Sequence, residues 1–121
     1  MSYSSLTLNV ADHIAYVALN RPDKANSINL AMWEELPALF AALNERDDVR
    51  VVVLSGNGKH FCAGIDLAMF GSMGADWADG PDGLKHEKLR LWIKKLQSSF
   101  TAIEHCRVPV IAAMHGACVG G

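Results

Sequence analysis

Two glycine-containing segments, each a short distance after an apolar run, carry the chemistry most readily expected of this sequence. Residues 63–67 (AGIDL) follow the run 51–54, and residues 116–121 follow the run 110–114. Glycine permits sharp turns and lets a ligand approach backbone N–H groups closely. If both segments open helices, their free N–H groups point at one spot with partial positive charge behind them. Two convergent N–H donors form an oxyanion hole.

Each glycine segment alone is more simply an ordinary turn between a strand and a helix, because short glycine motifs are weak signals. The two together, in this order, are much more specific. Asp66 is interpreted as a residue that caps its own turn, and contact with a substrate is the less favoured alternative. The other candidate acids lie on predicted helices, where solvated side chains are the simplest interpretation; they are Glu34, Glu35, Glu45, Glu87 and Glu104.

Apolar periodicity predicts the strands that position these segments. Alternation over 5–10 and 14–19 predicts an antiparallel hairpin at the start of the chain. The nearly continuous β-branched run over 49–54 is typical of a strand covered on both faces in a parallel sheet. A last buried strand is predicted over 110–114.

Helical spacing predicts two longer helices. The first is capped by Ser27 or Asn29 and ends at 47–48, and Pro37 should kink or split it. The second covers 84–105 and carries one apolar stripe. A short helical segment is expected through Met69 and Phe70, and a loop over 71–83.

Composition excludes several classes of protein. The 121 residues carry a formal net charge of −2 and are half hydrophobic, which is unlike disordered or nucleic-acid-binding chains. No apolar run approaches the roughly 20 residues that span a bilayer. The first residues lack the pattern of a signal or transit peptide, so a cytoplasmic protein is expected. Three cysteines at no zinc-like spacing predict neither a disulfide nor a metal site, and the scattered histidines predict no metal ligation.

Three segments give the sequence its resemblance to a known family. They are LNRPDKANSIN (19–29), VVVLSGNGKHFCAGIDL (51–67) and VPVIAAMHGACVGG (108–121). Their order and spacing resemble the enoyl-CoA hydratase/isomerase, or crotonase, superfamily, and the last resembles its dienoyl-CoA isomerase-like branch. The resemblance implies an α/β fold, a spiral of β-β-α units, of which 1–121 would be the N-terminal part of a single domain. It also implies a homotrimer or homohexamer.

The family's chemistry implies an acyl-CoA thioester substrate and an enolate held by two backbone N–H groups. Matched residue by residue, the donors are Ile65 and Gly121. No metal or redox cofactor is implied, because coenzyme A is part of the substrate. The resemblance also assigns contacts with CoA, with Arg21 and Lys24 as candidate phosphate ligands; the full set is Arg21, Lys24, Ala25, Ser27, Ala63, Gly64, Ile65, Asp66 and Leu67. Solvated loop cations are the alternative for Arg21 and Lys24. The acyl chain would meet Met69, Phe70, Met73 and Trp77, unless these are core or subunit contacts.

Four functions remain open from the sequence. The favoured function is double-bond isomerisation of (di)enoyl-CoA in fatty-acid β-oxidation, and 2-enoyl-CoA hydration is the first alternative. The family's acid/base carboxylates follow the glycine motif, beyond Gly121. The chain is therefore expected to be truncated within that motif, and 1–121 alone to be inactive and aggregation-prone. If 121 residues were the whole protein, a non-catalytic CoA-binding or oligomerisation module would be favoured. A Rossmann-like nucleotide binder is weak, since no GxGxxG follows the first strand.

Overall fold

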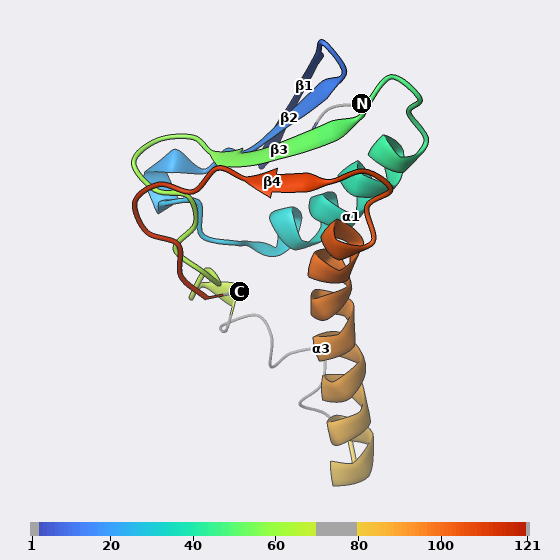
Figure 1. Ribbon diagram of the computed structural model, residues 1–121. Coiled ribbons are helices and arrows are strands. Elements are labelled where there is room, and N and C mark those ends of the chain that lie inside the picture. The colour runs from blue at the N-terminus through green and yellow to red at the C-terminus, as the bar shows by residue number, and fades with distance from the viewer. Residues whose placement is uncertain (1–2, 70–79, 121) are drawn as a thin grey trace.

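Four strands form a single sheet in the computed structural model, which describes residues 3–69 and 80–120 (Figure 1). β1 (Leu6–Ala11) and β2 (Ile14–Leu19) are antiparallel, as predicted. β3 (Val51–Gly56) lies between β2 and β4 (Val110–Ala112) and is parallel to both. The predicted parallel position of the valine-rich strand is therefore confirmed, although β4 is shorter than expected.

Helix α1 (Leu30–Asn44) lies under the sheet and shares one hydrophobic core with it (Figure 1). Asn29 caps the helix, because its side-chain oxygen accepts the N–H of Met32 at 3.0 Å. A short 3-10 helix, η1 (Pro22–Lys24), precedes this cap. The apolar residues that α1 buries are those that the helical spacing predicted: Met32, Trp33, Leu36, Leu39, Phe40 and Leu43.

Glu35 is a correction to the expectation of solvated helix carboxylates. Its side chain accepts hydrogen bonds from the backbone N–H and the hydroxyl of both Ser4 and Ser5, at 2.7–3.2 Å. Burial works to raise the pKa of the Glu35 carboxyl, but these hydrogen bonds outweigh it and hold the pKa below the usual 4.5. The carboxylate thereby ties the segment before β1 to α1.

The expected split at Pro37 is wrong, because α1 is continuous through that residue. Proline has no N–H, so the carbonyl of Trp33, four residues earlier, lacks its helical donor. The buried hydroxyl of Ser99 supplies this donor, at 2.5 Å from the Trp33 oxygen. A tertiary contact therefore satisfies the carbonyl that proline leaves without a partner.

Helix α3 (Asp82–Glu104) brings Ser99 to α1 and begins two residues before its predicted start. The ring of Phe100 lies 4.9 Å from that of Trp33, centroid to centroid. The N-terminal part of α3 extends away from the body of the molecule (Figure 1), and Leu91 is 53% exposed there. None of the helices in the described ranges is long and apolar enough to cross a membrane. Most of the predicted loop 71–83 lies outside the described residues.

Candidate active site

Beyond the carboxyl ends of β2 and β3, two loop segments pair in parallel. The N–H of Ala63 donates to the carbonyl of Ala25 at 3.0 Å, and the N–H of Ile28 donates to the carbonyl of Gly64 at 2.8 Å. Since β2 and β3 are parallel neighbours, their following loops leave the sheet at the same edge. The first glycine segment is thereby joined to the loop that the resemblance assigns to CoA.

The second glycine segment pairs with the other side of the first. The N–H of Cys62 donates to the carbonyl of Ala117 at 3.1 Å, and the N–H of Val119 donates to the carbonyl of Cys62 at 3.0 Å. The C-terminal segment, red in Figure 1, accordingly runs beside the yellow-green segment that follows β3. The structure thus brings together the two glycine segments that the sequence predicted to converge.

Gly64 is at the contact between these segments. Its φ of +99° lies in the left-handed region, where residues with a Cβ are strained. A Cβ at this position would also be 2.8 Å from the carbonyl oxygen of Val119, closer than real Cβ atoms come. Both the conformation and the close approach therefore require glycine before Ile65.

The N–H of Ile65 points away from the neighbouring loop. In the parallel bridge between Ile28 and Ile65, the hydrogen bonds come from the flanking groups, the Gly64 carbonyl and the Asp66 N–H. The N–H of Ile65 itself therefore faces the other side of its strand. Within the described part of the chain it has no hydrogen-bond acceptor. Gly121, the second predicted donor, lies outside the described residues.

Arg21 forms a partly buried ion pair with Asp66, and the two atoms Nη2 and Oδ2 are 3.1 Å apart. Arg21 Nη1 also donates to the carbonyl and the hydroxyl of Ser27. The other oxygen of Asp66 accepts the N–H of Ala68 at 3.0 Å, which agrees with the predicted turn-capping interpretation. The Ala68 N–H and then the Arg21 guanidinium hold the pKa of the Asp66 carboxyl below its usual 3.8, against desolvation.

Two residues that the sequence interpretation missed connect these loops. Asn26 is fully buried; its oxygen accepts the N–H of Arg21 at 2.7 Å, and its amide donates to the carbonyls of Asn57 and His60. The ring Nδ1 of His60 accepts the N–H of Ala117 at 2.9 Å. No sequence pattern singles out either residue, because the burial of Asn26 and the contact of His60 with Ala117 follow from the fold.

The remaining predicted CoA contacts are spread along the same loops. Lys24 is exposed on η1, and Ala25 has a φ of +53° just after it. Ala63 is exposed, and Leu67 is 77% exposed. Lys24, Ala63 and Leu67 are therefore accessible to a ligand and Ala25 is half-buried, whereas the guanidinium of Arg21 is engaged within the chain.

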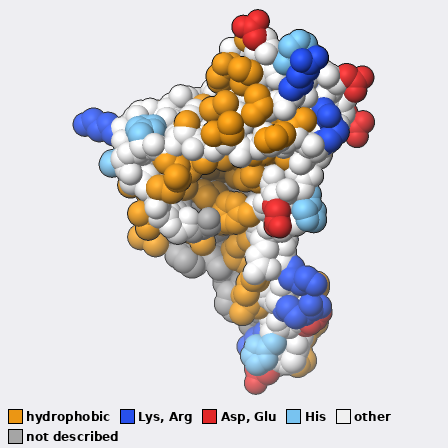
Figure 2. Space-filling model, in the orientation of Figure 1, with side chains coloured by type: hydrophobic (Ala, Val, Ile, Leu, Met, Phe, Trp, Pro, Cys, Tyr) orange, Lys and Arg blue, Asp and Glu red, His pale blue; other side chains and the backbone are white. Residues whose placement is uncertain are grey.

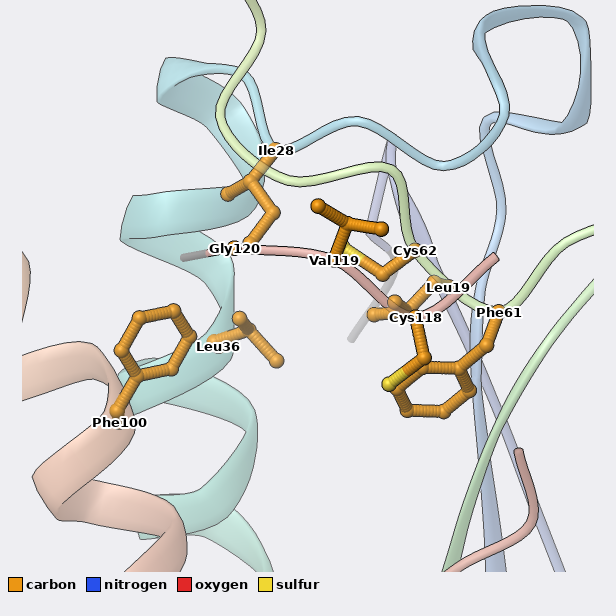
Figure 3. A pocket seen from close by; sticks show the side chains of 9 residues that line it. All are labelled: Leu19, Ile28, Leu36, Phe61, Cys62, Phe100, Cys118, Val119 and Gly120. Carbon is orange, nitrogen blue, oxygen red and sulfur yellow. The ribbon is translucent and has the colours of Figure 1, made fainter. Parts of the chain in front are cut away.

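An apolar pocket of about 160 Å³ lies between the helices and the paired glycine segments. In Figure 3, Leu36 and Phe100 approach it from α1 and α3, and Phe61 and Cys118 approach from the opposite side. Hydrophobic side chains also edge a hollow on the face shown in Figure 2. The described residues that line the pocket are Leu19, Ile28, Leu36, Phe61, Cys62, Phe100, Cys118, Val119 and Gly120.

Met69, one of the predicted acyl-chain contacts, does not line this pocket. It is 6% exposed and belongs to the hydrophobic core, which is the alternative that the sequence left open. The other three predicted contacts, Phe70, Met73 and Trp77, lie outside the described residues.

The sequence profile of the enoyl-CoA hydratase/isomerase family matches residues 9–121. The chain belongs to that family. The peroxisomal Delta(3,5)-Delta(2,4)-dienoyl-CoA isomerase of Arabidopsis thaliana is 44% identical over 99% of this chain and 45% of its own length. The mitochondrial enzyme of the same name from Homo sapiens is 43% identical over 99% of this chain and 37% of its own length. The chain thus spans less than half of these relatives.

Solved structures agree with the family assignment. An enoyl-CoA hydratase/carnithine racemase from Magnetospirillum magneticum superposes with a TM-score of 0.81 at 32% identity, over 98% of this chain and 42% of that one. The predicted α/β fold is therefore confirmed as that of enoyl-CoA hydratase/isomerase structures. The family is one of enzymes, so the convergent glycine segments are a candidate active site.

Proposed function

We propose that the full-length protein binds an acyl-CoA thioester and stabilises its enolate between the N–H groups of Ile65 and Gly121. The observation that carries this proposal is the packing of the two glycine segments against each other, with the Ile65 N–H directed away from its paired loop. Removing a proton beside a thioester moves negative charge onto its oxygen. Fixed donors aimed at that oxygen stabilise the transition state more than the ground state, by about 3–4 kcal/mol each.

Double-bond isomerisation is the reaction that the relatives favour, because dienoyl-CoA isomerases match nearly the whole chain at over 40% identity. In this reaction a base removes a proton from the acyl chain, the enolate delocalises over the double bonds, and a proton returns at a more distant carbon. The proposal places the acid/base carboxylates beyond Gly121. It needs no cofactor, since the steps are proton transfers and no electrons are exchanged with a second molecule.

Hydration of a 2-enoyl-CoA is the second candidate. It is supported by a probable enoyl-CoA hydratase of Mycobacterium tuberculosis that is 34% identical over 98% of this chain. Hydration uses the same enolate and the same pair of donors, but adds water at the β-carbon. The two reactions differ in the carboxylates that move protons.

The proposal also covers binding and assembly. Lys24 offers an exposed cation to the CoA phosphates, and segment 63–67 pairs with the loop that carries Lys24, through the hydrogen bond from the Ala63 N–H to the Ala25 carbonyl. A homotrimer or homohexamer is proposed for the full-length protein. A cytoplasmic location stays a prediction. The dienoyl-CoA isomerases named above have other locations, peroxisomal and mitochondrial.

Ultraviolet absorbance and mass spectrometry with the full-length protein together separate the candidates. A 3,5-dienoyl-CoA should be converted to its 2,4-isomer with no change in mass, and the new absorbance of a diene conjugated with the thioester detects this isomer. Hydration of a 2-enoyl-CoA would instead add one water to the mass. Turnover of neither substrate, with CoA ester binding retained, would contradict the enzyme proposal and favour a binding module.

A further inference from the structure

We propose that Arg21 is a positioning residue, which acts through Asp66 to hold the Ile65 N–H in place. The inference rests on the proposed function, because it concerns the donor that would bind the thioester oxygen. It assigns to Arg21 a role different from that of a CoA phosphate ligand. Three features of the structure support it: the ion pair, the second anchor at Ser27, and the exposure of the turn that it holds.

The ion pair is placed directly beside the donor. Asp66 follows Ile65 in the chain, and its Oδ2 lies 3.1 Å from Arg21 Nη2. The two side chains are only 17% and 20% exposed, so water screens this pair less than a surface pair. Its geometry is therefore coupled to the peptide group that carries the Ile65 N–H.

A second anchor fixes the guanidinium itself. Arg21 Nη1 donates to the carbonyl and hydroxyl of Ser27, so one planar group joins the CoA-side loop to the glycine turn. The backbone N–H of Arg21 is in turn held by the buried Asn26 side chain at 2.7 Å. The fork geometry of arginine can reach both partners at once, which a lysine ammonium cannot reproduce.

Apolar packing covers only part of the turn. Ala63 is exposed and Leu67 is 77% exposed, while the partly buried Ile65 packs against the core. Two backbone hydrogen bonds with Ile28 flank the donor: the Ile28 N–H donates to the Gly64 carbonyl, and the Asp66 N–H donates to the Ile28 carbonyl. The Arg21–Asp66 pair adds a side-chain restraint to them, beside the hydrogen bonds from the Ala68 N–H to Asp66 and from the Gly64 N–H to the Cys62 sulfur.

The test compares Arg21→Met, Arg21→Lys and Asp66→Asn in the full-length protein, with the double variant Arg21→Met/Asp66→Asn. Arg46→Met is the matched control, because Arg46 forms an exposed pair with Asp48 in the segment before β3, whereas the turn follows the other end of that strand. Backbone hydrogen exchange is measured on the peptide 60–69 without ligand. Steady-state kinetics are measured on the same acyl group carried by CoA and by pantetheine, which lacks the nucleotide phosphates.

The proposal predicts several-fold faster exchange in the peptide 60–69 for all three single variants, and no change for Arg46→Met. It predicts a fall of kcat by about 10- to 100-fold with little change in KM, of equal size for CoA and pantetheine thioesters. Arg21→Lys should fail as badly as Arg21→Met, and the double variant should be little worse than either single one.

Two results would overturn the inference. One is unchanged exchange in the peptide 60–69. The other is a loss that appears as a raised KM for the CoA ester and disappears with the pantetheine ester, because that pattern identifies a phosphate ligand. If the wild type turned over neither ester while the exchange rose as expected, the proposed function would fail and the restraint on the turn would stand.

Discussion

Replacing Ser99 with alanine removes the only side-chain donor seen for the carbonyl of Trp33 in the described part of the chain. The Ser99 hydroxyl lies 2.5 Å from that oxygen and is buried, with the residue 1% exposed. Because Pro37 has no N–H to offer, the carbonyl would be left without a partner. A buried polar group without a partner costs about 1–3 kcal/mol, so Ser99→Ala should lower the free energy of unfolding by that amount.

A double-mutant cycle tests the cause of this loss. Pro37→Ala returns an N–H at the position that normally bonds to the Trp33 carbonyl. In the Pro37→Ala background, Ser99→Ala should therefore cost less, with a coupling free energy of about 1–2 kcal/mol. Urea unfolding of the full-length protein at fixed concentration measures all four variants.

Ser98→Ala is the matched control, because Ser98 is the neighbouring serine on α3 and its hydroxyl bonds to a carbonyl of its own helix at an exposed position. Its free energy of unfolding should change by less than about 0.5 kcal/mol. The reasoning would be refuted if Ser98→Ala and Ser99→Ala cost the same, or if Pro37→Ala left the cost of Ser99→Ala unchanged.

Two further predictions concern the glycine turn and the N-terminal segment. Gly64→Ala should reduce turnover of the full-length protein by about 100-fold, because the added Cβ would press on the Val119 carbonyl and displace the N–H of Ile65. Gly80→Ala is the control: Gly80 also has a positive φ, +105°, but its Cβ would meet only a flexible side chain, so kcat should be nearly unchanged. Equal losses in the two variants would contradict this prediction. Glu35→Gln should lower stability by about 1 kcal/mol at neutral pH, since the carboxylate accepts hydrogen bonds from residues 4–5. The pKa of Glu35 is lowered in the folded state, so this contribution is full above the unfolded value of about 4.5 and fades as the pH falls through the folded value; a difference that grew in acid would be contrary evidence.

The strands and helices could be predicted from the sequence because each is set by a local pattern. The valine run of β3 and the helical spacing of α1 need no distant contact to be recognised. The convergence of the two glycine segments could also be predicted, since successive parallel strands deliver their loops to one edge of a sheet.

What the sequence could not predict depends on contacts between distant residues. Proline inside a helical pattern favours a break, and only Ser99, 66 positions further along than Trp33, removes the reason for one. Arg21 in a loop has the chemistry of a phosphate ligand until Asp66 is found beside it. In both cases the side chain's type was informative, and its partner was fixed by the fold.

A crystal structure of the full-length protein with a saturated acyl-CoA thioester tests the central claim most directly. This ligand keeps the thioester carbonyl but has no double bond to move, so it should remain unreacted in the site. The account predicts the thioester oxygen at about 2.7–3.1 Å from the backbone nitrogens of both Ile65 and Gly121. A thioester oxygen bound elsewhere, or an Ile65 N–H that donates to a protein acceptor in the complex, would contradict it.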